Sequence, residues 1–359
     1  MVVRRIFSSR KIWAVGCLGV SLLIGLMIFF KTANNSSITA VPFFTSGAVA
    51  PLSPSPSPFP FQELTIPFLR EQKYPSQLND LSEITQNQNY TSYLTSYSSD
   101  GLKINGLLTR PNGEMPLGGW PAIVFVHGYI PPKQYQTTQN YVSYVDYLAS
   151  RGFVVFKIDL RGHGISEGEA GGAYYSSDYS IDALNARSAL AASDFVNPGK
   201  IGLWGHSMAG NVVFRSFAVK PEIPAVVIWA GAGYTYQDLQ KYRISDASYQ
   251  MPPADTPRLR KRQQLRQLYG DFSEDSSFWR QVAPTNYLSD LKGAVQIHHA
   301  VDDAVVSIEY SRNLMSLLDS TKIAHSLFEY PSGGHNLTGS SFTQAMERTV
   351  DFFRENLKN

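Results

Sequence analysis

Ser207 lies among small residues, where an apolar run gives way to a helical pattern. Residues 200–204 are predicted to form a buried strand, and residues 211–220 have the spacing of an amphipathic helix. A strand that turns sharply into a helix leaves room only for small side chains two positions before and after its tip. Gly205 and Ala209 occupy these two positions. The stretch therefore predicts a nucleophile elbow, which raises the Ser207 hydroxyl above the edge of a sheet.

An ordinary strand–loop–helix unit with an incidental serine is the alternative, since short matches of this kind also arise by chance. Ala209 departs from the glycine that is usual at its position. In favour of the elbow, the following helix would direct its free backbone N–H groups and the positive end of its dipole at an oxyanion. Evidence from residues elsewhere in the chain is needed to distinguish the two interpretations.

The composition excludes several classes of protein. Of the 359 residues, 43% are hydrophobic and 17% are charged, which is typical of a globular core. The net charge is only +2, and no basic block indicates a nucleic-acid partner. The single cysteine, Cys17, allows neither an intrachain disulfide nor a cysteine metal cluster. Five basic residues flank the apolar run around Cys17, so the rest of the chain has 31 − 5 = 26 basic and 29 acidic residues.

The N-terminal 61 residues are predicted to attach the protein to a membrane. Residues 12–30 carry no charge and, at about 1.5 Å per residue, span roughly 29 Å as a helix, enough to cross a bilayer core. Four basic residues precede the run and one follows it, so residues 1–31 are expected to be a single-pass anchor with a cytoplasmic N-terminus. A cleaved signal peptide, or a lipid anchor at Cys17, is the alternative. Residues 32–61, rich in proline and serine, are expected to form an extended linker.

Residues 62–359 are predicted to form one α/β domain with a mostly parallel sheet between helices, because strand and helix patterns alternate along them. A short helix and a loop are expected over 63–90. The strands are expected at 91–97, 102–109, 121–127, 152–160, 200–204, 225–230, 294–298 and 324–330. The helices are expected at 140–150, 179–192, 211–220, 308–318 and 342–357.

The alternation fails between residues 233 and 286. This polar and aromatic segment contains a basic helical pattern at 257–269. Because it follows the strand after the Ser207 helix, it is predicted to be a cap over the carboxyl edge of the sheet. A solvated surface helix is the alternative.

A nucleophilic serine needs a base, and the base needs an orienting acid. Of the seven histidines, His335 lies in a small-residue loop after the last predicted strand, at the sheet edge where catalytic side chains collect. The loop after the preceding strand holds Asp302 and Asp303. The chain order serine, aspartate, histidine is the one expected for this architecture. Ser207 and His335 are therefore predicted to be catalytic, with Asp302 or Asp303 as the acid.

An oxyanion hole is expected from two backbone N–H groups. Met208 follows the candidate nucleophile, and Tyr129 lies in the loop after the strand that ends near His127. Gly128 allows the backbone to approach a ligand closely. The alternative for this loop is a plain turn that ends a strand.

Six stretches of the chain resemble the α/β-hydrolase superfamily and, most closely, the catalytic domain of prolyl oligopeptidase-type serine peptidases. They are residues 98–111, 124–128, 159–164, 205–210, 297–305 and 333–335. The resemblance extends over residues 92–358. It implies that the acid is Asp302, because the family's acid comes three residues before a valine, here Val305. The chain departs from the family at Ala209, at His127 where some members have tyrosine, and in leaving no room upstream for a β-propeller.

The predicted function is hydrolysis of peptide or ester bonds through a Ser–His–Asp acyl-enzyme mechanism, with no metal or organic cofactor. A small ester or a short peptide is the expected substrate, with the membrane as the other partner and no nucleic acid. A carboxylesterase acting on small esters is one alternative. A catalytically silent, membrane-tethered binding module is the alternative from another class.

Overall fold

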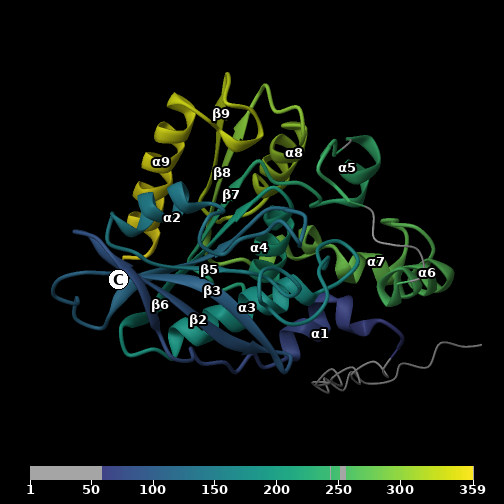
Figure 1. The fold of residues 1–359 in the computed structure, drawn as a ribbon. Helices are drawn as coiled ribbons and strands as arrows, with labels where there is room; N and C mark the ends of the chain where they lie inside the picture. Colours follow the sequence, from purple (N-terminus) through teal and green to yellow (C-terminus); the bar gives the residue numbers. More distant parts are fainter. Residues whose placement is uncertain (1–58, 243, 251–255, 359) are drawn as a thin grey trace, which may run out of the picture. The chain divides into compact units, whose positions relative to one another are not determined.

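The computed structural model describes residues 59–242, 244–250 and 256–358 (Figure 1). The predicted anchor and nearly all of the predicted linker lie outside these residues. Within the described ranges, no helix has both the length and the apolarity that a membrane span requires.

In the described ranges, nine strands form one sheet, in the order β1-β2-β3-β5-β4-β6-β7-β8-β9 (Figure 1). The first three neighbouring pairs are antiparallel, and every pair from β5 to β9 is parallel. The strands are β1 (Ser82–Gln86), β2 (Tyr90–Ser99), β3 (Leu102–Pro111), β4 (Trp120–Val126), β5 (Val154–Ile158), β6 (Val196–His206), β7 (Ala225–Trp229), β8 (Ala294–Ala300) and β9 (His325–Tyr330). The mostly parallel sheet expected from the sequence is confirmed.

Helices cover both faces of this sheet (Figure 1). Successive side chains of a buried strand point to opposite faces: Val124 packs in one core with α3 and α4, and Phe125 packs in the other with α2 and α9. The helices are α1 (Ile66–Glu71), α2 (Val142–Ala149), α3 (Asp178–Ala191), α4 (Met208–Val219), α5 (Tyr236–Lys241), α6 (Pro257–Tyr269), α7 (Ser277–Val282), α8 (Glu309–Leu318) and α9 (Ser340–Asn356), with 3-10 turns η1 (Gln62–Leu64), η2 (Pro284–Asp290) and η3 (Gly334–Asn336).

Two elements differ from expectation. Strand β1 lies in the segment expected to be a helix and a loop. All five of its residues are exposed, so this edge strand has no pattern of buried side chains by which the sequence could reveal it. Helix α4 begins at Met208 rather than at residue 211, because the chain turns into the helix directly after Ser207.

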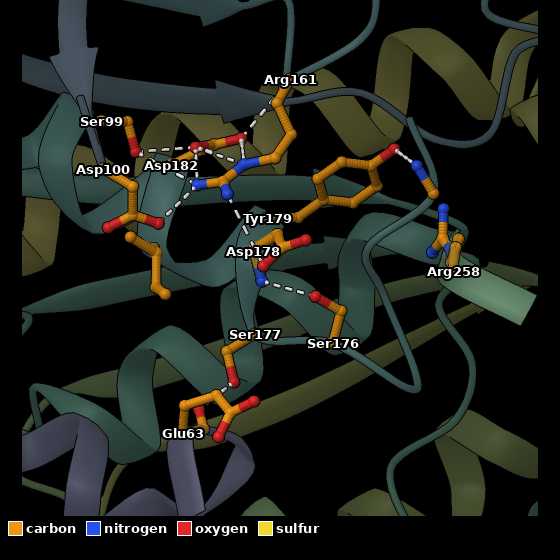
Figure 2. Close-up of polar contacts among 12 residues, drawn as sticks. Glu63, Ser99, Asp100, Arg161, Ser176, Ser177, Asp178, Tyr179, Asp182 and Arg258 are labelled. Atoms are coloured by element: carbon orange, nitrogen blue, oxygen red, sulfur yellow. Dashed lines mark hydrogen bonds and ion pairs between the residues drawn. The ribbon is translucent and has the colours of Figure 1, made fainter. Parts of the chain in front are cut away.

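A buried guanidinium fastens the loop after β5. Figure 2 shows Arg161 among three carboxylates, with its nitrogens 2.7 Å from Asp182, 2.9 Å from Asp100 and 3.6 Å from Asp178. Asp100 belongs to the turn between β2 and β3, and the other two carboxylates belong to α3. The cluster therefore joins the antiparallel hairpin, the loop after β5 and the start of α3.

The insertion between β7 and β8 contains α5, α6 and α7. Its apolar side chains form a small separate core with the start of the described chain, where Leu64 packs with Trp279 and Phe278. Tyr269 donates a hydrogen bond to the carbonyl of Pro60, at 2.7 Å. The insertion is therefore packed against the segment that enters the domain.

Candidate active site

Ser207 lies at the tip of a sharp turn between β6 and α4. Its backbone has φ 56° and ψ −120°, a conformation that non-glycine residues seldom adopt. A Cβ atom at Gly205 would lie 2.6 Å from the carbonyl oxygen of Ala209, so no larger residue fits there. The side chain of Ala209 is fully buried. These contacts explain why both positions that flank the serine are small.

His335 lies in η3, directly after β9, and its ring is held by Asp303. The distance from His335 Nδ1 to Asp303 Oδ2 is 2.8 Å, and the Asp303 side chain is fully buried. His299 Nε2 lies 3.1 Å from the same oxygen. The other carboxylate oxygen accepts hydrogen bonds from the backbone N–H groups of Val305 and Val306.

This environment keeps Asp303 ionised. Burial raises the pKa of its carboxyl, but the hydrogen bonds from His299 and His335 outweigh that effect and hold the pKa well below its usual range. A buried, ionised carboxylate on Nδ1 fixes the tautomer of His335 and leaves Nε2 on the opposite side of the ring. In the part of the chain that the structure describes, no hydrogen bond joins Ser207 to His335; such bonds often form only in the complex with substrate.

The preference for Asp302 is corrected by these contacts. Asp302 accepts hydrogen bonds from the backbone N–H groups of Gly334, at 2.8 Å, and Gly333, at 3.3 Å. It thus shapes the loop that carries His335, while its neighbour bonds the ring. The spacing between acid and valine is ambiguous in the sequence because two valines are adjacent. Asp302 lies three residues before Val305, and Asp303 lies three residues before Val306.

The two backbone N–H groups expected to form an oxyanion hole belong to two different segments, the start of α4 for Met208 and the loop after β4 for Tyr129. Met208 is the first residue of α4, where backbone N–H groups have no partner within the helix. Within the described residues, neither Met208 nor Tyr129 donates a backbone hydrogen bond to the protein. A Cβ at Gly128 would lie 2.9 Å from Tyr141 Oη, so the close approach of this loop requires glycine.

A chain of three hydrogen bonds joins the Gly128 loop to the His335 loop. The backbone N–H of Gly128 donates to Tyr141 Oη at 3.0 Å, Tyr141 Oη lies 2.7 Å from His206 Nδ1, and His206 Nε2 lies 2.8 Å from the carbonyl oxygen of His335. The carbonyl can only accept, so Nε2 carries the proton and Nδ1 accepts from the tyrosine. Burial lowers the pKa of His206 to about 3, which keeps it neutral. Neither His206 nor Tyr141 was among the residues predicted to form the site.

Residues 244–250 of the insertion reach from one candidate loop to another. The backbone N–H of Ser245 donates to the carbonyl of Val305 at 2.8 Å, next to the acid loop. At the other end, the backbone N–H of Gln250 donates to Tyr129 Oη at 2.9 Å, and the Tyr249 and Tyr129 rings are 5.4 Å apart. The segment thus joins the loops after β8 and β4.

Comparisons with known proteins find similarity to peptidases. Residues 121–267 match the family model described as serine aminopeptidase, S33. The uncharacterized peptidase YuxL of Bacillus subtilis (strain 168) is 23% identical over 283 residues, which are 78% of this chain and 40% of that protein. This chain therefore spans about two fifths of the length of that curated relative.

Solved structures include both esterases and peptidases. The acetyl xylan esterase from Paenibacillus sp. R4 superposes with a TM-score of 0.58 at 16% identity, over 81% of this chain and 92% of the esterase. The acylaminoacyl peptidase of Pyrococcus horikoshii gives a TM-score of 0.58 at 19% identity, over 77% of this chain and 44% of the peptidase. At these identities the likeness concerns the fold. The chain has the α/β-hydrolase fold.

Proposed function

We propose that the protein hydrolyses a peptide or ester bond of a small substrate, with Ser207 as nucleophile, His335 as base and Asp303 as orienting acid. The observation that carries this proposal is the 2.8 Å contact between buried Asp303 and His335, in the loop that also contacts His206 beside Ser207. The described residues supply a strained serine, an oriented imidazole and two free backbone donors, which are the parts that acyl transfer needs.

The reaction would proceed through an acyl-enzyme. Ser207 Oγ attacks the carbonyl carbon while His335 Nε2 takes its proton, and Asp303 stabilises the imidazolium. The Met208 and Tyr129 N–H groups donate hydrogen bonds to the oxyanion. His335 then gives the proton to the leaving amine or alcohol. Water, activated by the same imidazole, releases the acyl group and restores Ser207.

A peptide is the first candidate substrate, because the matched family model and the Bacillus subtilis relative are both described as peptidases. A carboxylesterase is the second candidate, because this chain spans 92% of the superposed esterase but 44% of the superposed peptidase. The segment 244–250, which joins the loops of Val305 and Tyr129, supports a cap that restricts the site to small substrates.

The test compares the full-length protein with Ser207→Ala on short-chain p-nitrophenyl esters and on aminoacyl p-nitroanilides. We expect turnover that falls by roughly 10⁶-fold in the variant, as in serine proteases that lose the nucleophile. Amide turnover supports the peptidase, and ester turnover alone supports the carboxylesterase. A protein with no Ser207-dependent turnover and no labelling by a fluorophosphonate would be the silent binding module instead.

We also propose that residues 12–30 tether the hydrolase to a membrane, with the catalytic domain on the side opposite the cytoplasm. The support is the charge asymmetry around this run in the sequence. Protease added to intact cells should digest the catalytic domain. A domain that is digested only after lysis would contradict the proposed orientation.

A further inference from the structure

Arg215 is a buried cation without an anionic partner. It lies two turns along α4 from Ser207 and is 2% exposed. Its terminal nitrogens donate to neutral oxygens only: the carbonyls of Ser176, at 2.9 Å, and Leu64, and the hydroxyl of Ser177, at 3.1 Å. Its Nε has no partner. In the described ranges, no carboxylate lies within ion-pair distance of this guanidinium.

The carboxylate of Asp178, whose charge acts on Arg215, is already engaged elsewhere. The charge of Asp178 raises the pKa of Arg215 from a longer distance. Asp178 lies only 3.6 Å from Arg161, and Figure 2 shows these two residues together. Its side chain is also 42% exposed, so water screens its charge. Burial lowers the pKa of Arg215 to about 10, still above physiological pH. The protein therefore buries a positive charge that no carboxylate of the described residues neutralises, and burying an unpaired charge is destabilising.

A small cavity lies beside this guanidinium. Its volume is about 20 Å³, and its lining includes Arg215, Asn211, Tyr234 and Tyr236. A cavity needs roughly 10–15 Å³ to hold one water molecule, so there is room for one particle of that size. Organic acids and oxyanions such as sulfate are too large.

Two polar groups of the lining have no hydrogen-bond partner within the described residues. They are the buried Nε of Arg215 and the buried hydroxyl of Tyr236, which also interacts electrostatically with Arg215. The amide N–H of Asn211 donates a hydrogen bond to the carbonyl oxygen of Gly233, so this acceptor is already occupied. Unpaired buried donors are rare in native proteins because each one costs free energy. The N–H of Arg215 Nε and the O–H of Tyr236, both at this cavity, therefore need an acceptor.

We infer that this cavity is a binding site for a monatomic halide, chloride under physiological conditions. A halide accepts hydrogen bonds from all sides, fits the volume and neutralises Arg215. A water molecule would also fit, but it would leave the positive charge without a counterion. The site is separate from the chemistry at Ser207, so its existence does not depend on the proposed function. A bound anion joins α4 to Tyr236, at the start of the insertion.

Crystals of the full-length protein soaked in sodium bromide provide a direct test, because bromide replaces chloride and gives an anomalous signal. We expect an anomalous peak in the cavity between Arg215 and Tyr236. A water molecule without an anomalous signal at that position would overturn the inference.

Melting temperatures provide a second test, in sodium bromide against sodium gluconate at equal ionic strength, since gluconate is too large to enter. A ligand that binds only the folded state stabilises it, so we expect the melting temperature to be roughly 2–4 °C higher in bromide. Tyr236→Phe should reduce this difference while keeping its ring, and Arg215→Met should abolish it. Tyr147→Phe, which lies on α2 away from the cavity, should retain it. A bromide effect of equal size in Tyr236→Phe and Tyr147→Phe, or no effect in the unaltered protein, would refute the site even if Arg215→Met fails to fold.

Discussion

Two fully buried carboxylates hold a nitrogen base in this protein, and the two bases differ. Asp303 bonds the imidazole of His335 at 2.8 Å, at the carboxyl edge of the sheet. Asp182 bonds the guanidinium of Arg161 at 2.7 Å, at the start of α3 (Figure 2). An imidazole gains and loses a proton near neutral pH, whereas a guanidinium does not.

The two pairs also differ in how many hydrogen-bond and ion-pair partners surround them. The Asp182 pair is completed by Ser99 and by the carboxylates of Asp100 and Asp178, so the guanidinium has partners in several directions. Hydrogen bonds and the charge of Asp182 outweigh burial and raise the pKa of Arg161 further. At the other pair, Nε2 of His335 has no hydrogen-bond partner among the residues that the structure describes. A saturated network of this kind fixes a loop, and an unsaturated one can transfer a proton.

Of the two pairs, the histidine pair is expected to show the larger effect. Asp303→Asn should lower kcat by about 10⁴-fold, because an amide stabilises the wrong tautomer of His335 and cannot support an imidazolium. Asp302→Asn is the matched control: it keeps an oxygen for the Gly334 N–H, so its loss should stay within about tenfold. Steady-state kinetics on the substrate found for the unaltered protein would measure both. A larger loss in Asp302→Asn than in Asp303→Asn would reverse the assignment of the acid.

At the pair of Asp182 and Arg161, a substitution should lower the stability of the fold rather than the turnover. Asp182→Asn leaves a buried guanidinium short of a charge partner, and the free energy of unfolding should fall by roughly 3–5 kcal/mol. The turnover per folded molecule should stay within a few-fold of the unaltered enzyme. Urea denaturation and active-site titration would separate the two quantities.

Asp178→Asn serves as the control for that prediction, since its carboxylate is 42% exposed and 3.6 Å from Arg161. Its cost should be below about 1 kcal/mol. Equal losses in the two variants would mean that burial does not distinguish the two carboxylates.

A smaller effect concerns His206, which joins the loops on either side of the site. Its folded-state pKa is about 3, against 6.5 when unfolded. Between these values the unfolded chain binds a proton that the folded chain does not, so stability falls as the pH falls through this window. From pH 7 to pH 5 its contribution should be a loss of roughly 2 kcal/mol. His206→Gln should remove that part of the acid sensitivity in urea titrations.

His325 offers a control of opposite sign. A hydrogen bond with Asp319 raises the pKa of His325, so its contribution to stability is present at low pH and is lost as the pH rises through the folded-state value. His325→Gln should therefore increase the sensitivity to acid, while His206→Gln decreases it. Identical pH profiles for the two variants would contradict the neutral state assigned to His206.

Local rules were sufficient for much of this protein. Alternating strands and helices predicted the sheet, because apolar spacing follows from strand and helix geometry. The small residues around Ser207 predicted the elbow, since a sharp turn excludes larger side chains at Gly205. The position of His335 in a glycine loop after the last strand predicted that it lies at the carboxyl edge. Strand β1 was missed because its exposed residues leave no such pattern.

The tertiary structure alone determined which side chains contact one another, whether they are adjacent or distant in the sequence. Asp302 and Asp303 are chemically identical neighbours, and only the packing of their loop turns one toward glycine N–H groups and the other toward the His335 ring. The same holds for Arg215, whose place in a helical pattern says nothing about which carboxylates lie near it. Sequence spacing determines which face of an element a side chain occupies, whereas the partners across that face come from other parts of the chain.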